Sequence, residues 1–109
     1  MTISAVPPVT PVKKFSSQML AVLTIFSADP NLMRLVEPYI DMAADEIIWD
    51  EIRKISFCSG HFGAVALAYA VWTDQVLEGV PVFDCALNMD FRLKRACLQA
   101  LSMRWGLKA

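Results

Sequence analysis

The sequence predicts an all-α fold, a compact bundle of four or five helices around a central apolar helix at about residues 60–77. Three observations lead to this prediction. Apolar residues recur with the helical period along most of the chain. No segment shows sustained alternation of apolar and polar residues, and residues 79–83 are the only strand candidate. The segment from Gly60 to Trp72 has no charged side chain, and a helix that is apolar on every side is buried by its neighbours.

Length and composition predict one domain with an apolar surplus. Of the 109 residues, 56% are hydrophobic and 19% are charged, whereas typical domains have about 45–50% and about 25%. We expect part of this surplus to lie at the surface, covered by another copy of the chain or by another protein. No segment has about 18 consecutive apolar residues, so no membrane span is expected. Three widely spaced cysteines and an N-terminus unlike a signal peptide favour a cytoplasmic location.

The first eleven residues differ from the rest of the chain. They contain three prolines and no apolar period, which predicts a flexible N-terminal arm at residues 1–11 and a single helical domain at residues 12–109. From about Val12 the apolar residues follow the helical period. Asp29 is a good N-cap for the next helix, and Pro30 suits its first position.

Pro38 interrupts the second helical pattern. A proline inside a helix removes a hydrogen bond, so we expect a short helix to about Val36 and a longer one from about Glu37. The later part, residues 41–56, has isoleucines on one side and charged residues on the other. This pattern predicts an amphipathic surface helix.

The central helix has candidate signals at both ends. Ser56 or Ser59 can cap its start, and Gly79 is expected to end it. Small residues recur every four positions at its start, which allows neighbouring backbones to approach closely. The segment that follows, residues 81–90, is a connector or a helical start capped by Asp84.

The last helix carries two apolar lines that diverge around it, and Gly106 ends it. We expect one line to enter the core and the other to meet a second copy in a two-fold dimer, the commonest assembly of soluble chains. The leading prediction is therefore a small non-enzymatic interaction or adaptor protein that acts as a homo-oligomer. The expected interface residues are Phe91, Leu98, Leu101 and Trp105.

Acids and bases are separated along the chain. Residues 29–51 contain seven acids and one base, and residues 89–109 contain five bases and one acid. In a dimer, the acidic segment 41–51 of one copy is expected to approach the basic helix 92–104 of the other. The basic helix leaves weak nucleic-acid binding open as an alternative, although a net charge of −1 argues against it.

Two arrangements keep an enzymatic function open. Cys58 and His61 are three residues apart at a predicted helix start, a position that favours a nucleophilic thiolate, but no third group that would orient the histidine is visible. The other alternative is a metal-dependent enzyme of the all-α nucleotide pyrophosphatase type, in which acids on facing helices bind magnesium. Its candidate ligands are Glu46, Asp50, Asp74 and Glu78. This acidic set is incomplete, so no cofactor is expected.

Overall fold

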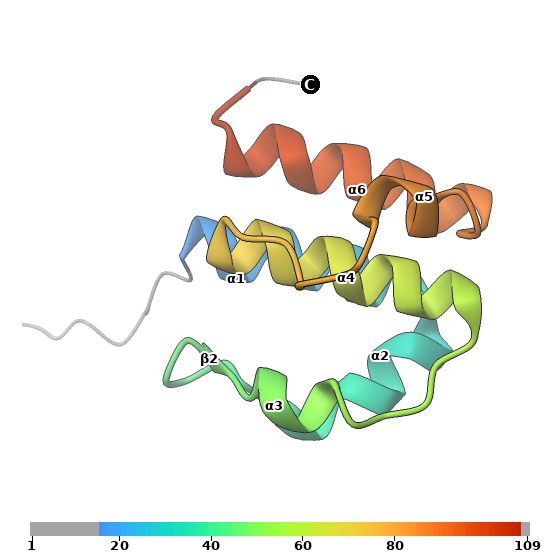
Figure 1. Ribbon diagram of the computed structural model, residues 1–109. Helices are drawn as coiled ribbons and strands as arrows, with labels where there is room; N and C mark the ends of the chain where they lie inside the picture. Colours follow the sequence, from blue (N-terminus) through green and yellow to red (C-terminus); the bar gives the residue numbers. More distant parts are fainter. Residues whose placement is uncertain (1–15, 108–109) are drawn as a thin grey trace, which may run out of the picture.

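The computed structural model of the protein describes residues 16–107, apart from the side chain of Phe83. The predicted arm at residues 1–11 lies outside the described residues. The part that is described is mainly helical, which confirms the all-α prediction (Figure 1). Its α-helices are α1 (Ser17–Ser27), α2 (Pro30–Val36), α3 (Trp49–Ile52), α4 (Ser59–Thr73), α5 (Val82–Ala86) and α6 (Phe91–Arg104).

The elements form three layers (Figure 1). Helices α1 and α4 pack against each other in the middle layer. On one side, α6 packs on both of them and α5 packs on α4. On the other side lie α2, α3 and the segment between them. The core fills the space between the layers, and its largest fully buried side chains include Phe26, Met19, Ile25, Leu32, Ile52 and Leu93.

The junction between α1 and α2 follows the predicted capping chemistry. Ser16 caps α1 by accepting the Met19 N–H at 3.0 Å, so this helix begins later than the predicted start at Val12. Asp29 caps α2, and Pro30 occupies the first turn of that helix, as predicted. The short second helix ends at Val36, which is also the predicted position.

The predicted amphipathic helix over residues 41–56 is wrong. A 3-10 turn, η3 (Glu37–Tyr39), leads into an antiparallel hairpin of β1 (Ile40–Asp41) and β2 (Glu46–Ile47), and only α3 is helical after it. Turn chemistry accounts for the difference. The Asp41 carboxylate accepts the Ala44 N–H at 3.0 Å, and Asp45 has a φ of 57°. Aspartate forms such local hydrogen bonds and tolerates the left-handed conformation, so it competes with helix formation.

Helix α3 is fixed to the middle layer by the Trp49 indole. The centroid of this ring lies 5.4 Å from that of Tyr69 and 6.4 Å from that of Trp72 on α4, and 6.3 Å from that of Phe26 on α1. These separations are typical of stacked and edge-to-face aromatic pairs. Ile52 is fully buried beside them, whereas Ile48 points out.

Helix α4 is the predicted central apolar helix. Ala64 and Ala68 are fully buried, which agrees with close packing through small residues. The helix ends at Thr73, four residues before the predicted end, because Asp74 adopts the left-handed conformation with a φ of 62°. Cys58 occupies the N-cap position instead of a serine. No helix among residues 16–107 is long and apolar enough to cross a membrane.

A loop after α4 leads to the short helix α5, and α6 follows it. Residues 79–83 form no strand and lead into α5, which agrees with a helical start in residues 81–90, but Asp84 lies within α5 instead of capping it. Asp90 caps α6 by accepting the Leu93 N–H at 2.9 Å. Gly106, with a φ of 72°, follows the end of α6 as predicted.

Candidate interaction surface

One line of large apolar side chains on α6 points away from the core. Phe91, Leu98 and Trp105 are spaced by seven residues, which is close to two helical turns, so they lie on one face. Their exposed fractions are 71%, 69% and 66%. The other face of α6 enters the core through Leu93, Ala96, Cys97 and Ala100, all of which are buried. The two apolar lines predicted for this helix therefore separate into a buried face and an exposed one.

An apolar groove runs beside this line, between α6 and the elements that precede it. Two hollows of about 250 and 240 Å³ form the groove, and both are lined by Leu67 and Leu101. Leu101 itself is half-buried. The remaining apolar lining residues are Ala70, Val71, Val76, Val82 and Trp105 in one hollow and Ala86, Leu87, Met89, Cys97 and Leu98 in the other. The exposed line and the groove together are called the α6 surface below.

Arg104 joins the end of α6 to the end of α4. Its Nε donates to the Val71 carbonyl at 3.1 Å, and its guanidinium lies 2.9 Å from Asp74 Oδ2. Arg104 is largely buried, so these contacts fix one end of the groove. Asp74, one of the candidate metal ligands, therefore forms an ion pair with Arg104.

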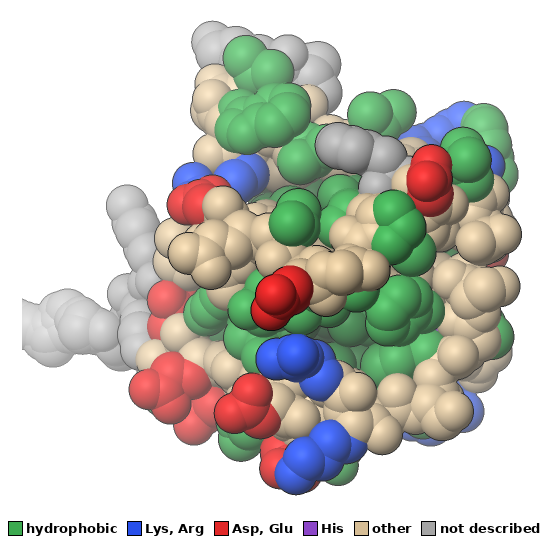
Figure 2. All heavy atoms as spheres, in the orientation of Figure 1, with side chains coloured by type: hydrophobic (Ala, Val, Ile, Leu, Met, Phe, Trp, Pro, Cys, Tyr) green, Lys and Arg blue, Asp and Glu red, His purple; other side chains and the backbone are tan. Residues whose placement is uncertain are grey.

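Helix α6 as a whole is rich in basic residues. From Phe91 to Arg104 the helix contains four bases and no acid. The Arg95 guanidinium lies over the Phe91 ring at 4.6 Å from its centroid. On the face shown in Figure 2, several acidic side chains lie over the β1–β2 hairpin and α3, on the opposite side of the middle layer from α6, and others lie apart from them, nearer α5 and α6.

The other flank of α6 is polar. A hollow of about 420 Å³ lies between α1 and α6, and the lining residues include Thr24, Arg92, Arg95 and Gln99. These arginines are the ones that suggested nucleic-acid binding. An aromatic side chain beside such arginines could stack on a base, but Trp105 lines the groove on the opposite flank and not this hollow.

The histidine of the Cys58–His61 pair has a partner that the sequence did not reveal. His61 Nε2 lies 2.9 Å from Asp29 Oδ2, and the other oxygen of Asp29 accepts the N–H groups of Asn31 and Leu32. Burial raises the pKa of Asp29, but the hydrogen bond from His61 and the two backbone N–H groups outweigh it, so the pKa lies below the usual value of 3.8. Asp29 thus links the start of α2 to the first turn of α4.

The thiol of this pair stands apart from the histidine. Cys58 is exposed at the N-cap of α4, and no hydrogen bond joins its Sγ to His61 within the described range. Asp29 could orient the histidine of a catalytic pair. In the structure, however, the contact between Asp29 and His61 joins α2 to α4 and does not involve Cys58. Cys97 is a different case, because burial raises the pKa of its thiol to about 12 and leaves it unreactive.

The candidate metal ligands lie on different elements. Glu46 is in β2, Asp50 is in α3 and Asp74 follows α4. Glu78 lies further along the same loop, at a separate pocket. Among residues 16–107, no three acids, histidines or cysteines come together as a metal-binding group.

No family model, no curated protein and no solved structure matches this chain. The α6 surface is therefore assigned from its geometry alone. It contains all four interface residues that the sequence predicts, three on the exposed line and Leu101 in the groove.

Proposed function

We propose that the protein is a small non-enzymatic interaction protein that works as a homodimer through the α6 surface. One observation carries the proposal: Phe91, Leu98 and Trp105 form an exposed apolar line beside an apolar groove. Contiguous apolar patches on a small domain are typical of interaction sites. Aromatic residues are enriched at the centres of such sites, where they fill pockets on the partner.

The spacing on α6 favours a second copy of the chain as the partner. Leu98 lies midway between Phe91 and Trp105, seven residues from each. A two-fold axis at Leu98 would place two α6 helices antiparallel, with Leu98 against its own copy and Phe91 beside Trp105 of the second copy. A surface with this symmetry is self-complementary, as a two-fold interface requires. The groove beside the line then receives apolar side chains from the second copy.

The charges on α6 predict how the stability of this dimer depends on salt. Arg104 pairs with Asp74 and Arg92 lies 3.8 Å from Asp90, whereas no salt bridge involves Lys94 or Arg95 in residues 16–107. The charges of Lys94 and Arg95 make two antiparallel α6 helices repel each other. The acidic hairpin lies on the opposite side of the molecule and faces away from this contact (Figure 1). The proposed pairing therefore replaces the expected approach of segment 41–51 to helix 92–104. Apolar contact provides the affinity, and salt strengthens the dimer by screening the repulsion.

The mass in solution of a matched pair of variants tests the proposal. Light scattering after size-exclusion chromatography is expected to give a dimer for the wild type at micromolar concentration and a monomer for Leu98→Glu. Gln99→Glu is the control, because this substitution introduces the same charge at an exposed neighbour that lies off the apolar line. Both variants are expected to keep the helical circular dichroism of the wild type. A Leu98→Glu protein that remains dimeric would contradict the proposed interface.

A further inference from the structure

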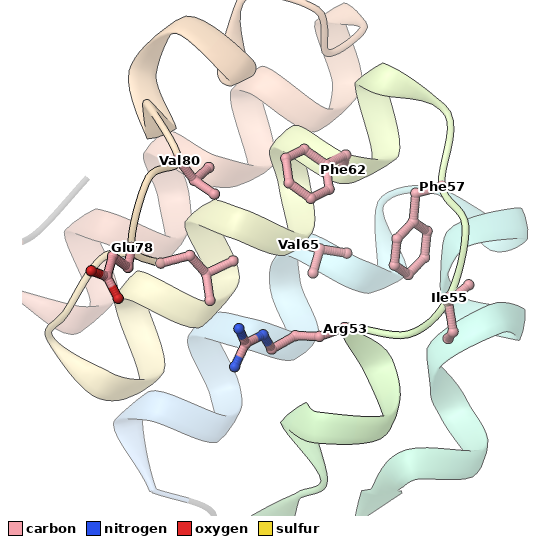
Figure 3. A pocket seen from close by; sticks show the side chains of 8 residues that line it. Arg53, Ile55, Phe57, Phe62, Val65, Glu78 and Val80 are labelled. Atoms are coloured by element: carbon pink, nitrogen blue, oxygen red, sulfur yellow. The ribbon is translucent and has the colours of Figure 1, made fainter.

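A second apolar pocket lies away from the α6 surface. Its volume is about 220 Å³, and its lining includes no residue of α5 or α6 (Figure 3). The walls come from the segment between α3 and α4, from α4 itself and from the loop after α4. The apolar lining residues are Ile55, Phe57, Phe62, Val65, Leu77 and Val80. Val65 and Leu77 are buried and form the floor, whereas Phe62 is 38% exposed.

Two opposite charges are the only other lining side chains. Arg53 and Glu78 lie on the same side of the pocket, away from Phe57 and Phe62 (Figure 3). In the described part of the chain, neither side chain forms a salt bridge or a hydrogen bond, and the two do not pair with each other. Both are exposed, so each has unused hydrogen-bonding capacity toward a ligand in the pocket.

We infer that this pocket binds a free apolar α-amino acid of about the size of leucine or phenylalanine. The Arg53 guanidinium would bind the carboxylate, because its fork of N–H donors matches a carboxylate in two parallel hydrogen bonds. The Glu78 carboxylate would accept hydrogen bonds from the ammonium group. The apolar side chain of the ligand would occupy the space between Phe62, Phe57 and the floor.

The size and the lining of the pocket favour a ligand of this class. A dry cavity of about 150 Å³ holds a benzene molecule, so 220 Å³ has room for one apolar side chain and not for a nucleotide or a larger lipid. None of the six apolar lining side chains can form a hydrogen bond, which disfavours sugars. A simple carboxylate would leave Glu78 beside a like charge, whereas a zwitterion pairs with both groups.

Backbone amide chemical shifts of ¹⁵N-labelled protein, followed during titration with four small molecules, test the inference. Phenylalanine is expected to shift the resonances of Phe57, Phe62 and Val80. Phenylalaninamide lacks the carboxylate and N-acetylphenylalanine lacks the ammonium group, so each is expected to bind at least about tenfold more weakly. Glycine, which lacks the apolar side chain, is expected to give no shifts at these positions. Equal binding of phenylalanine and N-acetylphenylalanine would overturn the inference, as would the absence of any shift with phenylalanine.

Variants at the charged edge provide the matched comparison. Arg53→Gln and Glu78→Gln are each expected to weaken phenylalanine binding at least about tenfold, since each removes one charge-assisted contact. Both residues are exposed, so the melting temperature is expected to stay at the wild-type value. Lys54→Gln is the control, because this substitution removes the same charge next to Arg53. Lys54 itself pairs with Glu51 and does not line the pocket. A loss of binding in Lys54→Gln equal to that in Arg53→Gln would overturn the assignment of Arg53.

Discussion

His61 Nε2 on α4 lies 2.9 Å from Asp29 Oδ2 at the N-cap of α2, 32 residues away in the sequence. Both side chains are largely buried. The same aspartate closes the first turn of α2, so one carboxylate holds an outer element and the central helix in a fixed relation. This contact between two helices is the role that the structure shows for the only histidine.

Replacing Asp29 by alanine is expected to cost more stability than the loss of an ordinary helix cap. Loss of a cap costs about 1 kcal/mol, and a buried group left without its hydrogen bond adds about 1–3 kcal/mol. Asp90→Ala is the comparison, because Asp90 also caps a helix, by accepting the Leu93 N–H, and its charged neighbour is the exposed Arg92 at 3.8 Å instead of a buried histidine. Urea denaturation should therefore give a larger loss for Asp29→Ala than for Asp90→Ala. Equal losses would mean that the His61 contact adds nothing.

The same pair predicts how stability depends on pH. The pKa of Asp29 is lower in the folded protein than its usual value of 3.8, so its contribution is complete above that value and is lost as the pH falls through the folded pKa. Asp29→Asn keeps a good cap but cannot ionise. The free energy of unfolding should differ most between wild type and variant above about pH 5, and the difference should shrink below about pH 4. A difference that stays constant down to about pH 2.5 would exclude this linkage.

A methyl group at Gly63 is expected to destabilise the protein. A Cβ atom there would lie 2.4 Å from the Cys85 carbonyl oxygen, which is backbone and cannot turn aside. In an open helix the change from glycine to alanine gains up to about 1 kcal/mol. Here we expect a loss of about 1–3 kcal/mol by urea denaturation. Gln99→Ala on exposed α6 is the control for helix propensity and should lose nothing. A Gly63→Ala protein as stable as the wild type would show that α4 and α5 can separate at little cost.

Local signals in the sequence account for the parts of the fold that were predicted. The Asp29 cap, Pro30 and Gly106 act through neighbours in the chain, so their effects can be predicted without a structure. The helix predicted for residues 41–56 was wrong because features of this segment favour different structures. Helical spacing of the isoleucines favours a helix, but the turn formed by Asp41 and Asp45 and the packing of Trp49 prevail.

For the candidate sites too, features within one helix could be predicted from the sequence, whereas contacts between separate elements could not. The split of α6 into a core face and an exposed face could be predicted from spacing alone, because both faces belong to one helix. The pairing of Asp29 with His61 could not, since it depends on how two separate helices pack. The meeting of Arg53 and Glu78 at one pocket was missed for the same reason. In the sequence, Glu78 was considered only as a metal ligand.

Sedimentation equilibrium of the wild type at two salt concentrations tests the homodimer most directly. The proposed pairing predicts a monomer–dimer equilibrium at micromolar protein, with a dissociation constant that falls as NaCl is raised from about 50 mM to about 500 mM, because salt screens the repulsion between the two α6 helices. A single species with the 12.2 kDa mass of the chain at every concentration would contradict the dimer. A dimer that weakens as salt is added would instead indicate contact between the acidic hairpin and α6, and would contradict the antiparallel α6 pairing.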